Sequence, residues 1–438
     1  MKASLITLGC SKNEVDSEMI ATYLQKKGFI LQNDLSQSEV ILINTCGFIN
    51  QAKQEAINTI LESSSYKNIG RCKHIIVTGC LAKRYKKQIY KELPEVDLVI
   101  GVDEYYKFDE IFSEYFKLSN SNFCLSFKDR VISSIFPMAY LRISDGCNNN
   151  CNYCAIPLIR GKLHSRKMED IVDEAKYLVK KGIRELCIIS QDTTSYGVDI
   201  YGSCKLLDLI KNISEIKELK WIRVLYMYPG RISDELLSEF ETNNKLCKYF
   251  DIPIQHISDN MLKTMNRHNT KKDIYYIVEK IRKRIPDSII RTTVMVGYQG
   301  ERERDFLELL EGINDLKFDR LGAFEFSKED DTGAINISGD IEEKIKKDRY
   351  NRIMLSQQKV LLETMEKRLG NTYEVVVEDV TENGEYFICR SYMDAPDVDP
   401  RIYLDVKENK NTVIIGEYYN VILERIAGYD YIAKLKEE

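Results

Sequence analysis

Three short apolar runs near the start of the chain each lead into a cysteine, and this pattern constrains the fold more than any other feature. LITLG precedes Cys10, VILINT precedes Cys46, and HIIVTG precedes Cys80. The stretches Asn13 to Lys27 and Ala52 to Ser64 have helical spacing. Strands that alternate with helices form a parallel sheet, in which the carboxyl ends of the strands share one edge. We therefore expect an α/β domain with an open parallel sheet and the three cysteines close together at that edge.

A second alternating series follows a polar connector at about Leu118 to Ser134. Its expected strands are AYLRIS, ELCIIS, WIRVLYM, YFDIPIQ, IIRTTVMVG and RLGAFEF. Its expected helices include Glu169 to Lys181, Asp234 to Glu241, Lys271 to Arg284 and Glu303 to Leu316. Six strand and helix units fit a partial (β/α)6 barrel better than a closed eightfold one.

The pattern changes again toward the end of the chain. The charged segment Ile341 to Leu369 predicts one long amphipathic helix. From Asn371 onward only short strands follow, namely TYEVVVED, EYFICRSY, IYLDVK, YYNVILERI and YIAKL, which predicts a small all-β barrel domain. We place the three domains at residues 1–117, 133–366 and 367–436.

The composition is that of a folded globular protein, with 30% charged and 44% apolar residues. The start, MKASLITLGCSKNE, has too short an apolar run for a signal peptide, and no stretch is apolar for about eighteen residues. We therefore expect a cytoplasmic protein without a membrane partner. In such a reducing compartment the 12 cysteines should serve metals or catalysis more often than disulfides.

The loop DGCNNNCNYCAIP places Cys147, Cys151 and Cys154 directly after the first strand of the central domain. A structural zinc site usually has four ligands, and no fourth Cys or His lies nearby in the sequence, so zinc-binding or incidental cysteines are the weaker alternatives. A 4Fe-4S cube held by three cysteines leaves one iron open for a chelating substrate. The amino and carboxylate groups of S-adenosylmethionine (SAM) suit such an open iron.

This CxxxCxxC motif, after the first strand of a six-unit barrel, resembles the radical SAM superfamily. The resemblance implies an enzyme in which the reduced cluster on these three catalytic cysteines cleaves SAM to a deoxyadenosyl radical. It also implies further cofactor-binding residues. Carried over by position, Tyr153 flanks the adenosyl group, and Gln191 and Asp192 in SQDTTSYG lie at the barrel mouth.

The sequences around the first three cysteines, LGCSKNEVDSE, NTCGFINQAKQE and GCLAKRY, resemble the amino-terminal domain of the methylthiotransferase family. The resemblance implies that Cys10, Cys46 and Cys80 hold an auxiliary 4Fe-4S cluster that supplies sulfur, and that the carboxyl-terminal domain is a TRAM domain. The alternative is that strand-end cysteines are only small buried hydrophobic residues. The remaining cysteines match no family motif and are expected to be structural or neutral: Cys72, Cys124, Cys187, Cys204, Cys247 and Cys389.

Branches of this family divide by target, either an adenosine next to the tRNA anticodon or an aspartate of a ribosomal protein. GCSKNEVDSE, IPIQHISD and SYMDAPDVD resemble the ribosomal branch. The resemblance therefore implies transfer of a methylthio group to the β-carbon of an aspartate in small-subunit ribosomal protein S-twelve. The alternative is a tRNA adenosine methylthiotransferase.

Two local features leave alternatives open. The segment VGYQGER departs from the family pattern, because Tyr298 and Gln299 stand where Phe and Pro are usual. The resemblance therefore does not predict the geometry of this loop. His256 lies in IPIQHISD, where it either forms hydrogen bonds within the barrel or contacts substrate.

The charge of the carboxyl-terminal domain bears on the partner. From Asn371 to the end the chain has 15 Asp and Glu against 7 Lys and Arg. Modules that bind nucleic acid gain affinity through Lys and Arg, so this balance argues against direct nucleic-acid binding and suits a basic protein partner. The alternative is that the acidic surface only maintains solubility. We also expect an electron donor, a sulfur source and a monomeric enzyme.

The resemblance implies a mechanism that uses two molecules of SAM. One donates a methyl group to sulfur at the auxiliary cluster, and the other yields the radical that removes a hydrogen from the aspartate β-carbon. Both clusters must then face one cavity. A rival from a different class is a non-catalytic iron-sulfur or zinc protein that senses redox state or assists ribosome assembly.

Overall fold

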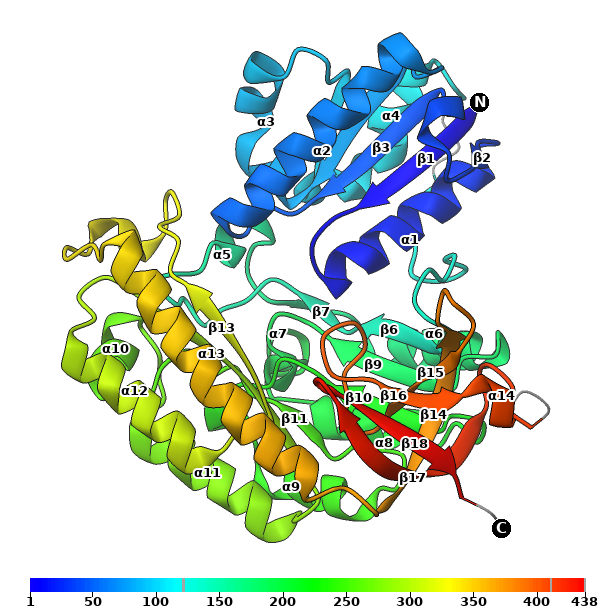
Figure 1. Cartoon of the computed structure of the whole chain (residues 1–438). Coiled ribbons are helices and arrows are strands. Elements are labelled where there is room, and N and C mark those ends of the chain that lie inside the picture. Colours follow the sequence, from blue (N-terminus) through cyan, green and yellow to red (C-terminus); the bar gives the residue numbers. More distant parts are fainter. Residues whose placement is uncertain (120–122, 410–411, 437–438) are drawn as a thin grey trace.

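The computed structural model describes residues 1–119, 123–409 and 412–436, and Figure 1 shows a sheet domain, a central barrel and a small carboxyl-terminal barrel. Residues 120–122, within the predicted connector, lie outside the described residues, as do 410–411 and 437–438. No helix in the described part of the chain is long and apolar enough to cross a membrane.

The amino-terminal domain is an open sheet of five parallel strands in the order β2-β1-β3-β4-β5. The strands are β1 (Lys2–Thr7), β2 (Ile30–Leu31), β3 (Val40–Thr45), β4 (His74–Gly79) and β5 (Leu98–Gly101), and the helices are α1 (Ser11–Lys26), α2 (Asn50–Ile69), α3 (Cys80–Glu92) and α4 (Phe108–Phe116). The predicted parallel sheet is confirmed. β3 is buried at every position, as expected of a strand that helices cover on both faces.

Two details of this domain differ from the expectation. β1 ends at Thr7, so Cys10 lies beyond the strand rather than directly at its end, because the chain turns at Gly9 with a φ of 100°. The sequence pattern does not predict β2 and β5, since runs of 2 and 4 residues carry too little periodicity.

The central domain contains six parallel strands in two groups, β10-β9-β6 and β11-β12-β13, joined by a single bridge between Ile222 and Leu246. The strands are β6 (Met138–Arg142), β9 (Glu185–Ile189), β10 (Trp221–Val224), β11 (Tyr249–Asp251), β12 (Ile289–Val296) and β13 (Arg320–Glu325). The helices are α5 (Ile156–Ile159), α6 (Met168–Lys180), α7 (Val198–Tyr201), α8 (Leu206–Ser214), α9 (Asp234–Thr242), α10 (Asp259–Thr264), α11 (Lys271–Arg284) and α12 (Glu303–Leu316), with a small ribbon of β7 (Ser144–Asp145) and β8 (His164–Ser165). The predicted six-unit partial barrel is confirmed.

A long helix and a closed barrel complete the chain. The helix α13 (Glu343–Glu366) packs beside α12 and β13. The barrel order is β14-β15-β16-β18-β17, from strands β14 (Thr372–Val380), β15 (Tyr386–Ser391), β16 (Ile402–Asp405), β17 (Tyr418–Ala427) and β18 (Asp430–Leu435), with a short helix α14 (Val406–Asn409). The predicted all-β domain is confirmed, although the last two residues of the expected strand IYLDVK begin α14.

The carboxyl-terminal barrel packs against the strand face that the central helices leave uncovered. One apolar cluster joins Tyr140 and Trp221 of the central strands to Val375 and Leu404 of the small barrel. A buried ion pair crosses the same contact, because Arg390 of β15 bonds Glu185 of β9 at 2.6 Å, while Glu378 of the small barrel itself bonds Arg390 at 2.7 Å. Removing one partner of such a buried pair costs about 3–5 kcal/mol, so these residues fix how the two domains sit.

Some carboxylates of this acidic domain form contacts inside the molecule. Asp394 pairs with Arg320 of β13 at 2.8 Å, and Asp399 accepts a hydrogen bond of 2.5 Å from the Tyr249 hydroxyl. These carboxylates of the SYMDAPDVD segment therefore hold the barrel in place and are not displayed to a basic partner.

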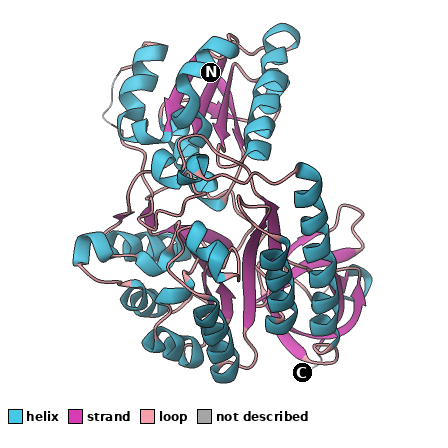
Figure 2. Cartoon of the chain, turned by 90° about the vertical axis from the view of Figure 1, so that its left-hand side faces the viewer, coloured by secondary structure: helices cyan, strands magenta, loops and turns pink. Residues whose placement is uncertain are grey.

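The amino-terminal domain sits on the end of the central barrel from which β7 and α5 project (Figures 1 and 2). Its helix α1 carries part of the contact, and Lys53 of α2 and Arg84 of α3 also pair with Glu329 of the central domain. Asp16 bonds Arg142 of β6 at 2.6 Å, and Glu18 is ion-paired with Arg130. Because these groups are buried, the junction is specific in position and not a loose tether.

Candidate active site at the junction of two domains

Cys10, Cys46 and Cys80 follow three neighbouring strands of the amino-terminal sheet and converge at its carboxyl edge. Gly9 shows how close they lie, because a Cβ added there would stand 2.7 Å from Cys46 Cβ. The Cys80 thiol lies 3.6 Å from Asn13 Oδ1 on the first turn of α1. The structure therefore brings together the three residues that the sequence pattern placed at one edge.

The electrostatic surroundings of these thiols are unequal. Burial raises the pKa of Cys80 to about 12 and also raises the pKa of Cys46. Cys10 is exposed at the surface, although protein atoms surround its thiol on the other sides. Burial by these atoms raises the pKa of the thiol, but Lys12, Arg160 and backbone N–H groups have the larger combined effect, and the pKa is lowered. Cations beside a thiol favour the thiolate, which is the form that binds metals.

Cys147, Cys151 and Cys154 lie in the loop between β7 and α5. Gly146 begins the loop with a φ of 71°, and a Cβ there would stand 2.1 Å from the Lys162 carbonyl oxygen, so only glycine fits. The loop is fixed by backbone bonds, including Cys154 N–H to the Cys151 carbonyl at 3.0 Å and Cys147 N–H to the Gly161 carbonyl at 3.2 Å. Burial, together with the neighbouring thiols, raises the pKa of Cys154 to about 12.

Neither cysteine group has the form of a closed single-ion site. In the described ranges no three His, Cys, Asp or Glu side chains lie close enough to hold one metal ion. Each group offers three thiols, with cations close by: Arg160 Nη2 lies 3.7 Å from the Cys80 sulfur, and Arg267 Nη1 lies 4.0 Å from the Cys151 sulfur. A set of three thiolates with cations around it suits an anionic iron-sulfur cluster with one open iron.

The predicted cofactor-binding residues lie around the second cysteine group. The Tyr153 ring is half-buried and meets the Tyr298 ring edge-on at 6.5 Å. Gln191 donates a hydrogen bond of 3.0 Å to Asp145. Asp192 accepts a bond of 2.8 Å from Asn149 and is ion-paired with Arg231. Burial raises the pKa of the Cys147 thiol, Asp192 raises it further, and Arg231 lowers it.

Arg160, which the sequence analysis does not single out, joins the two cysteine groups. Its guanidinium bonds Asp16 at 2.7 Å and Asn13 at 2.9 Å in the amino-terminal domain, and Asp145 at 3.2 Å in the central domain. It is also the group that approaches the Cys80 sulfur. The available signal was the recurrence of polar residues at Asn13 and Asp16, at helical spacing directly after a cysteine.

The loop Gly297 to Arg302 is well ordered by hydrogen bonds despite its unusual sequence. Glu301 accepts from Gly297 N–H at 2.5 Å and pairs with Arg349 at 2.7 Å. The ring nitrogen Nδ1 of His256 accepts from two backbone N–H groups, so its Nε2–H donates to Glu301 at 3.1 Å. His256 is therefore fully used within the barrel, which favours the hydrogen-bonding alternative over a substrate contact.

The six cysteines outside the motifs have ordinary positions. Cys72, Cys187, Cys247 and Cys389 are buried, and Cys124 and Cys204 are exposed. Three of the buried ones belong to the apolar cluster that joins the central and carboxyl-terminal barrels: Cys187, Cys247 and Cys389.

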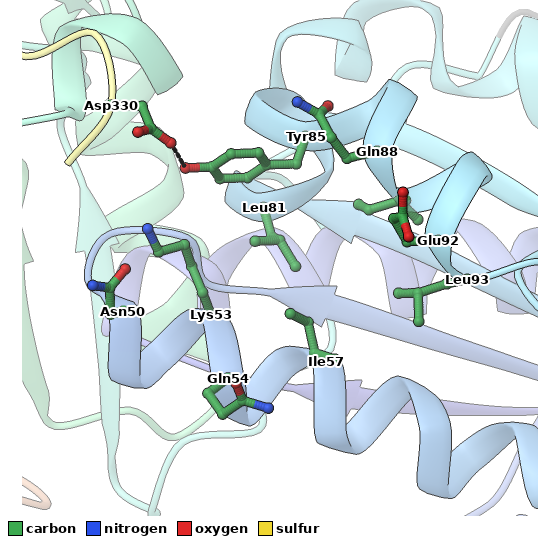
Figure 3. Close-up of a pocket in the computed structure, with 11 residues that line it drawn as sticks. Asn50, Lys53, Gln54, Ile57, Leu81, Tyr85, Gln88, Glu92, Leu93 and Asp330 are labelled. Atoms are coloured by element: carbon green, nitrogen blue, oxygen red, sulfur yellow. Dashed lines mark hydrogen bonds between the residues drawn. The ribbon is translucent and has the colours of Figure 1, made fainter.

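A separate cavity of 490 Å³ lies in the amino-terminal domain (Figure 3). Its walls include the apolar side chains of Ile57, Leu81 and Leu93, and the Tyr85 hydroxyl donates a hydrogen bond of 3.1 Å to Asp330 at its rim. None of the cysteines of either motif lines it, so this cavity is distinct from the site described above.

Comparisons with known families agree with the three-part architecture. Residues 2–101 match the Uncharacterized protein family UPF0004, residues 141–313 match the Radical SAM superfamily, and residues 369–435 match the TRAM domain. Several solved structures share the fold, and two serve as examples. They are the radical SAM methyltransferase TsrM from Kitasatospora setae (TM-score 0.55, 11% identity, 74% of each chain covered) and the cobalamin-dependent radical SAM enzyme OxsB (TM-score 0.51, 14% identity, 83% of this chain and 56% of that one). The fold and the cysteine loop thus define a radical SAM protein.

Curated relatives narrow this class. Proteins named ribosomal protein uS12 methylthiotransferase RimO match from Alkaliphilus oremlandii (46% identical, 100% of both chains), Clostridium botulinum strain Eklund 17B (43%, 100% of this chain and 98% of that one) and Clostridioides difficile (43%, 100% and 99%). The chain belongs to the ribosomal protein uS12 methylthiotransferase RimO family. The tRNA branch is not favoured by these relatives.

Proposed function

We propose that this protein is a radical SAM methylthiotransferase that adds a methylthio group to the β-carbon of an aspartate in ribosomal protein uS12. One observation carries the proposal. Cys80, the first residue of α3 in the amino-terminal domain, packs in one buried cluster with Ala155 and Ile159, and Ala155 directly follows Cys154. Two cysteine groups from separate domains thus lie at one junction, as a reaction that needs both requires.

The cofactors proposed for this junction are SAM and two 4Fe-4S clusters. When bound, a cluster on Cys147, Cys151 and Cys154 supplies the electron that cleaves SAM, and a cluster on Cys10, Cys46 and Cys80 supplies the sulfur. The donor sets support this assignment, because each has three thiols and an arginine within 4.0 Å of a sulfur atom. A further electron donor and a sulfur source complete the proposal.

Protein groups around the second cysteine loop would bind and orient SAM. Tyr153 offers a half-buried aromatic ring beside the loop. Asp192 is fixed by Asn149, Ser195 and Arg231, so its position is set before a ligand arrives. Gln191 keeps its buried Oε1 without a hydrogen-bond partner in the described residues, which leaves an acceptor free. Preset polar groups of this kind reduce the cost of positioning a reactant.

We propose that the junction also limits the access of water to the reacting atoms on every side but the opening beside Cys10. Arg130, Arg142 and Arg160 seal it with ion pairs whose side chains are at most 5% exposed on the arginine side. Such exclusion strengthens electrostatic interactions and protects a reactive radical. We also propose that the enzyme acts as a monomer, since both cysteine groups come from one chain.

The function is tested by incubating the reconstituted enzyme with SAM, a reductant, a sulfide source and either uS12 or tRNA, followed by mass spectrometry. The expected product is uS12 that carries one methylthio group, with tRNA unchanged. A Cys204→Ala variant is the matched control, because this exposed cysteine lies outside both motifs. Modification of tRNA alone would overturn the substrate assignment, and no SAM cleavage at all would favour a non-catalytic metal-binding protein.

A further inference from the structure

Lys12 is a buried cation that the site described so far leaves without a partner. Its side chain lies on the first turn of α1, two residues after Cys10, and the residue is only 7% exposed. Among the described residues its ammonium forms no ion pair and no hydrogen bond. The ammonium instead faces the Tyr226 ring, whose centroid lies 3.3 Å from Nζ.

This placement is unfavourable for a lysine unless an anion binds. Burying an unpaired charge is costly, and a contact with an aromatic ring recovers only about 0.5–2 kcal/mol. The amino-terminal end of a helix carries partial positive charge, which further disfavours a cation there. Arg142 and Arg160 add two more cations to the same junction, although both are paired with Asp16. Within the described ranges, no carboxylate pairs with Lys12 in this way.

Lys12 lies between the two domains that form the site. It belongs to the amino-terminal domain and lies close enough to Cys10 to lower the pKa of that thiol. Tyr226 belongs to the central barrel and follows β10, where its φ of 60° and a 2.9 Å bond from its N–H to Asp251 fix the backbone. The ammonium therefore stands between the first cysteine group and the mouth of the barrel.

An ammonium has three donors and no acceptor, so its natural ligand is an oxygen anion. On the proposed function, the group that must come to rest beside the first cysteine group is the side chain of the target aspartate, whose carboxylate is attached directly to the reacting β-carbon. We propose that Lys12 binds this carboxylate and so positions the β-carbon and selects an acidic side chain. This inference rests on the proposed function and adds a specificity-determining residue to it.

A rival role for Lys12 is to neutralise the thiolates of the first cysteine group. The two roles differ in what they predict. If Lys12 neutralises the cysteine thiolates, its removal should lower the iron content with either substrate. If Lys12 binds the substrate, its removal should abolish only the preference of the enzyme for an aspartate over its uncharged amide.

The test is a double-mutant cycle on the reconstituted enzyme with SAM present. The enzyme forms are wild type, Lys12→Met, Lys12→Arg and Lys26→Met. Lys26 is a matched control, because it lies at the other end of α1 and its ammonium also faces an aromatic ring, that of Phe123 at 5.8 Å. The ligands are uS12 and a uS12 variant with Asn at the target aspartate, and the readouts are the Kd of each and the iron content.

Wild type and Lys26→Met should bind aspartate-containing uS12 about ten- to a hundredfold more tightly than the Asn form, the range expected of a charged hydrogen bond. Lys12→Met should bind both forms equally and weakly with normal iron content, and Lys12→Arg should recover part of the preference. An unchanged preference in Lys12→Met, or a loss of iron in that variant, would overturn the inference. If wild type modifies uS12 yet Lys12→Met keeps its preference, only this inference fails; if wild type does not modify uS12, the proposed function fails with it.

Discussion

Arg160 is the side chain on which the junction of the two cysteine groups depends most. Its side chain is 2% exposed, and it bonds Asp16 at 2.7 Å and Asp145 at 3.2 Å. Breaking a buried pair by removing one partner costs about 3–5 kcal/mol. Because Asp16 keeps Arg142 at 2.6 Å, we expect Arg160→Gln to lower the free energy of unfolding by about 3 kcal/mol, the lower end of that range.

The same substitution should weaken the first cluster site by a separate route. Arg160 Nη2 lies 3.7 Å from the Cys80 sulfur, and loss of a group that supports a metal ligand typically costs about 10–100-fold in metal affinity. Arg142→Gln is the matched control, since Arg142 pairs with the same two aspartates, at 2.6 Å and 3.6 Å, without a hydrogen bond to a thiol.

Urea unfolding and the rate of iron loss to a chelator separate the two effects. Both variants should be less stable, but Arg160→Gln should lose about half of its iron much faster than Arg142→Gln. Equal rates of iron loss in the two variants would refute the reasoning, because the thiol contact would then contribute nothing beyond the ion pairs.

Three further predictions follow from individual side chains. Cys46→Ala should still cleave SAM but form no carbon–sulfur bond, as measured by deoxyadenosine release and by the mass of uS12; normal methylthiolation would contradict the assignment. Arg390→Met should lower the free energy of urea unfolding by about 3–5 kcal/mol, because it removes the arginine that pairs with the buried Glu378 and leaves Glu185 with Arg223 alone, and a loss under about 1 kcal/mol would count against it. Burial, with help from Glu18 and Asp397, raises the pKa of Glu14 from 4.5 to about 7, so folding retains a proton that the unfolded chain releases and stability falls as the pH rises through that window. Glu14→Gln should therefore raise the melting temperature above pH 7 and not below pH 4.5; the same gain at both would contradict it.

The sequence predicts the fold where periodicity is strong. VILINT and HIIVTG become β3 and β4 at the expected residues, because each is a short apolar run with β-branched residues. Lys271 to Arg284 becomes α11 with the expected bounds, because it combines a helical period with a capping box at Thr270. The pattern fails at β2 and β5, which exist because neighbouring strands offer pairing partners. Pairing across the sheet is a tertiary effect that no local window contains.

The sequence likewise predicts some residues of the candidate site and misses others. Cys10, Cys46 and Cys80 could be grouped from sequence, because parallel strands bring their carboxyl ends to one edge. Arg160 and Lys12 could not, since their roles arise from contacts between domains more than a hundred residues apart in sequence, such as Arg160 with Asp16. The acidic composition of the carboxyl-terminal domain was likewise ambiguous, because a count of charges does not reveal that Asp394 and Asp399 turn inward.

The central claim is that two cysteine groups at one junction hold two separate clusters, and iron and acid-labile sulfide content after anaerobic reconstitution tests it most directly. Wild type should contain about eight irons, and the triple Ala variant of Cys147, Cys151 and Cys154 should contain about four. The triple Ala variant of Cys10, Cys46 and Cys80 should also retain about four. About four irons in wild type that fall to none in the first variant would mean that the amino-terminal cysteines bind no cluster, and the account of sulfur transfer would be wrong.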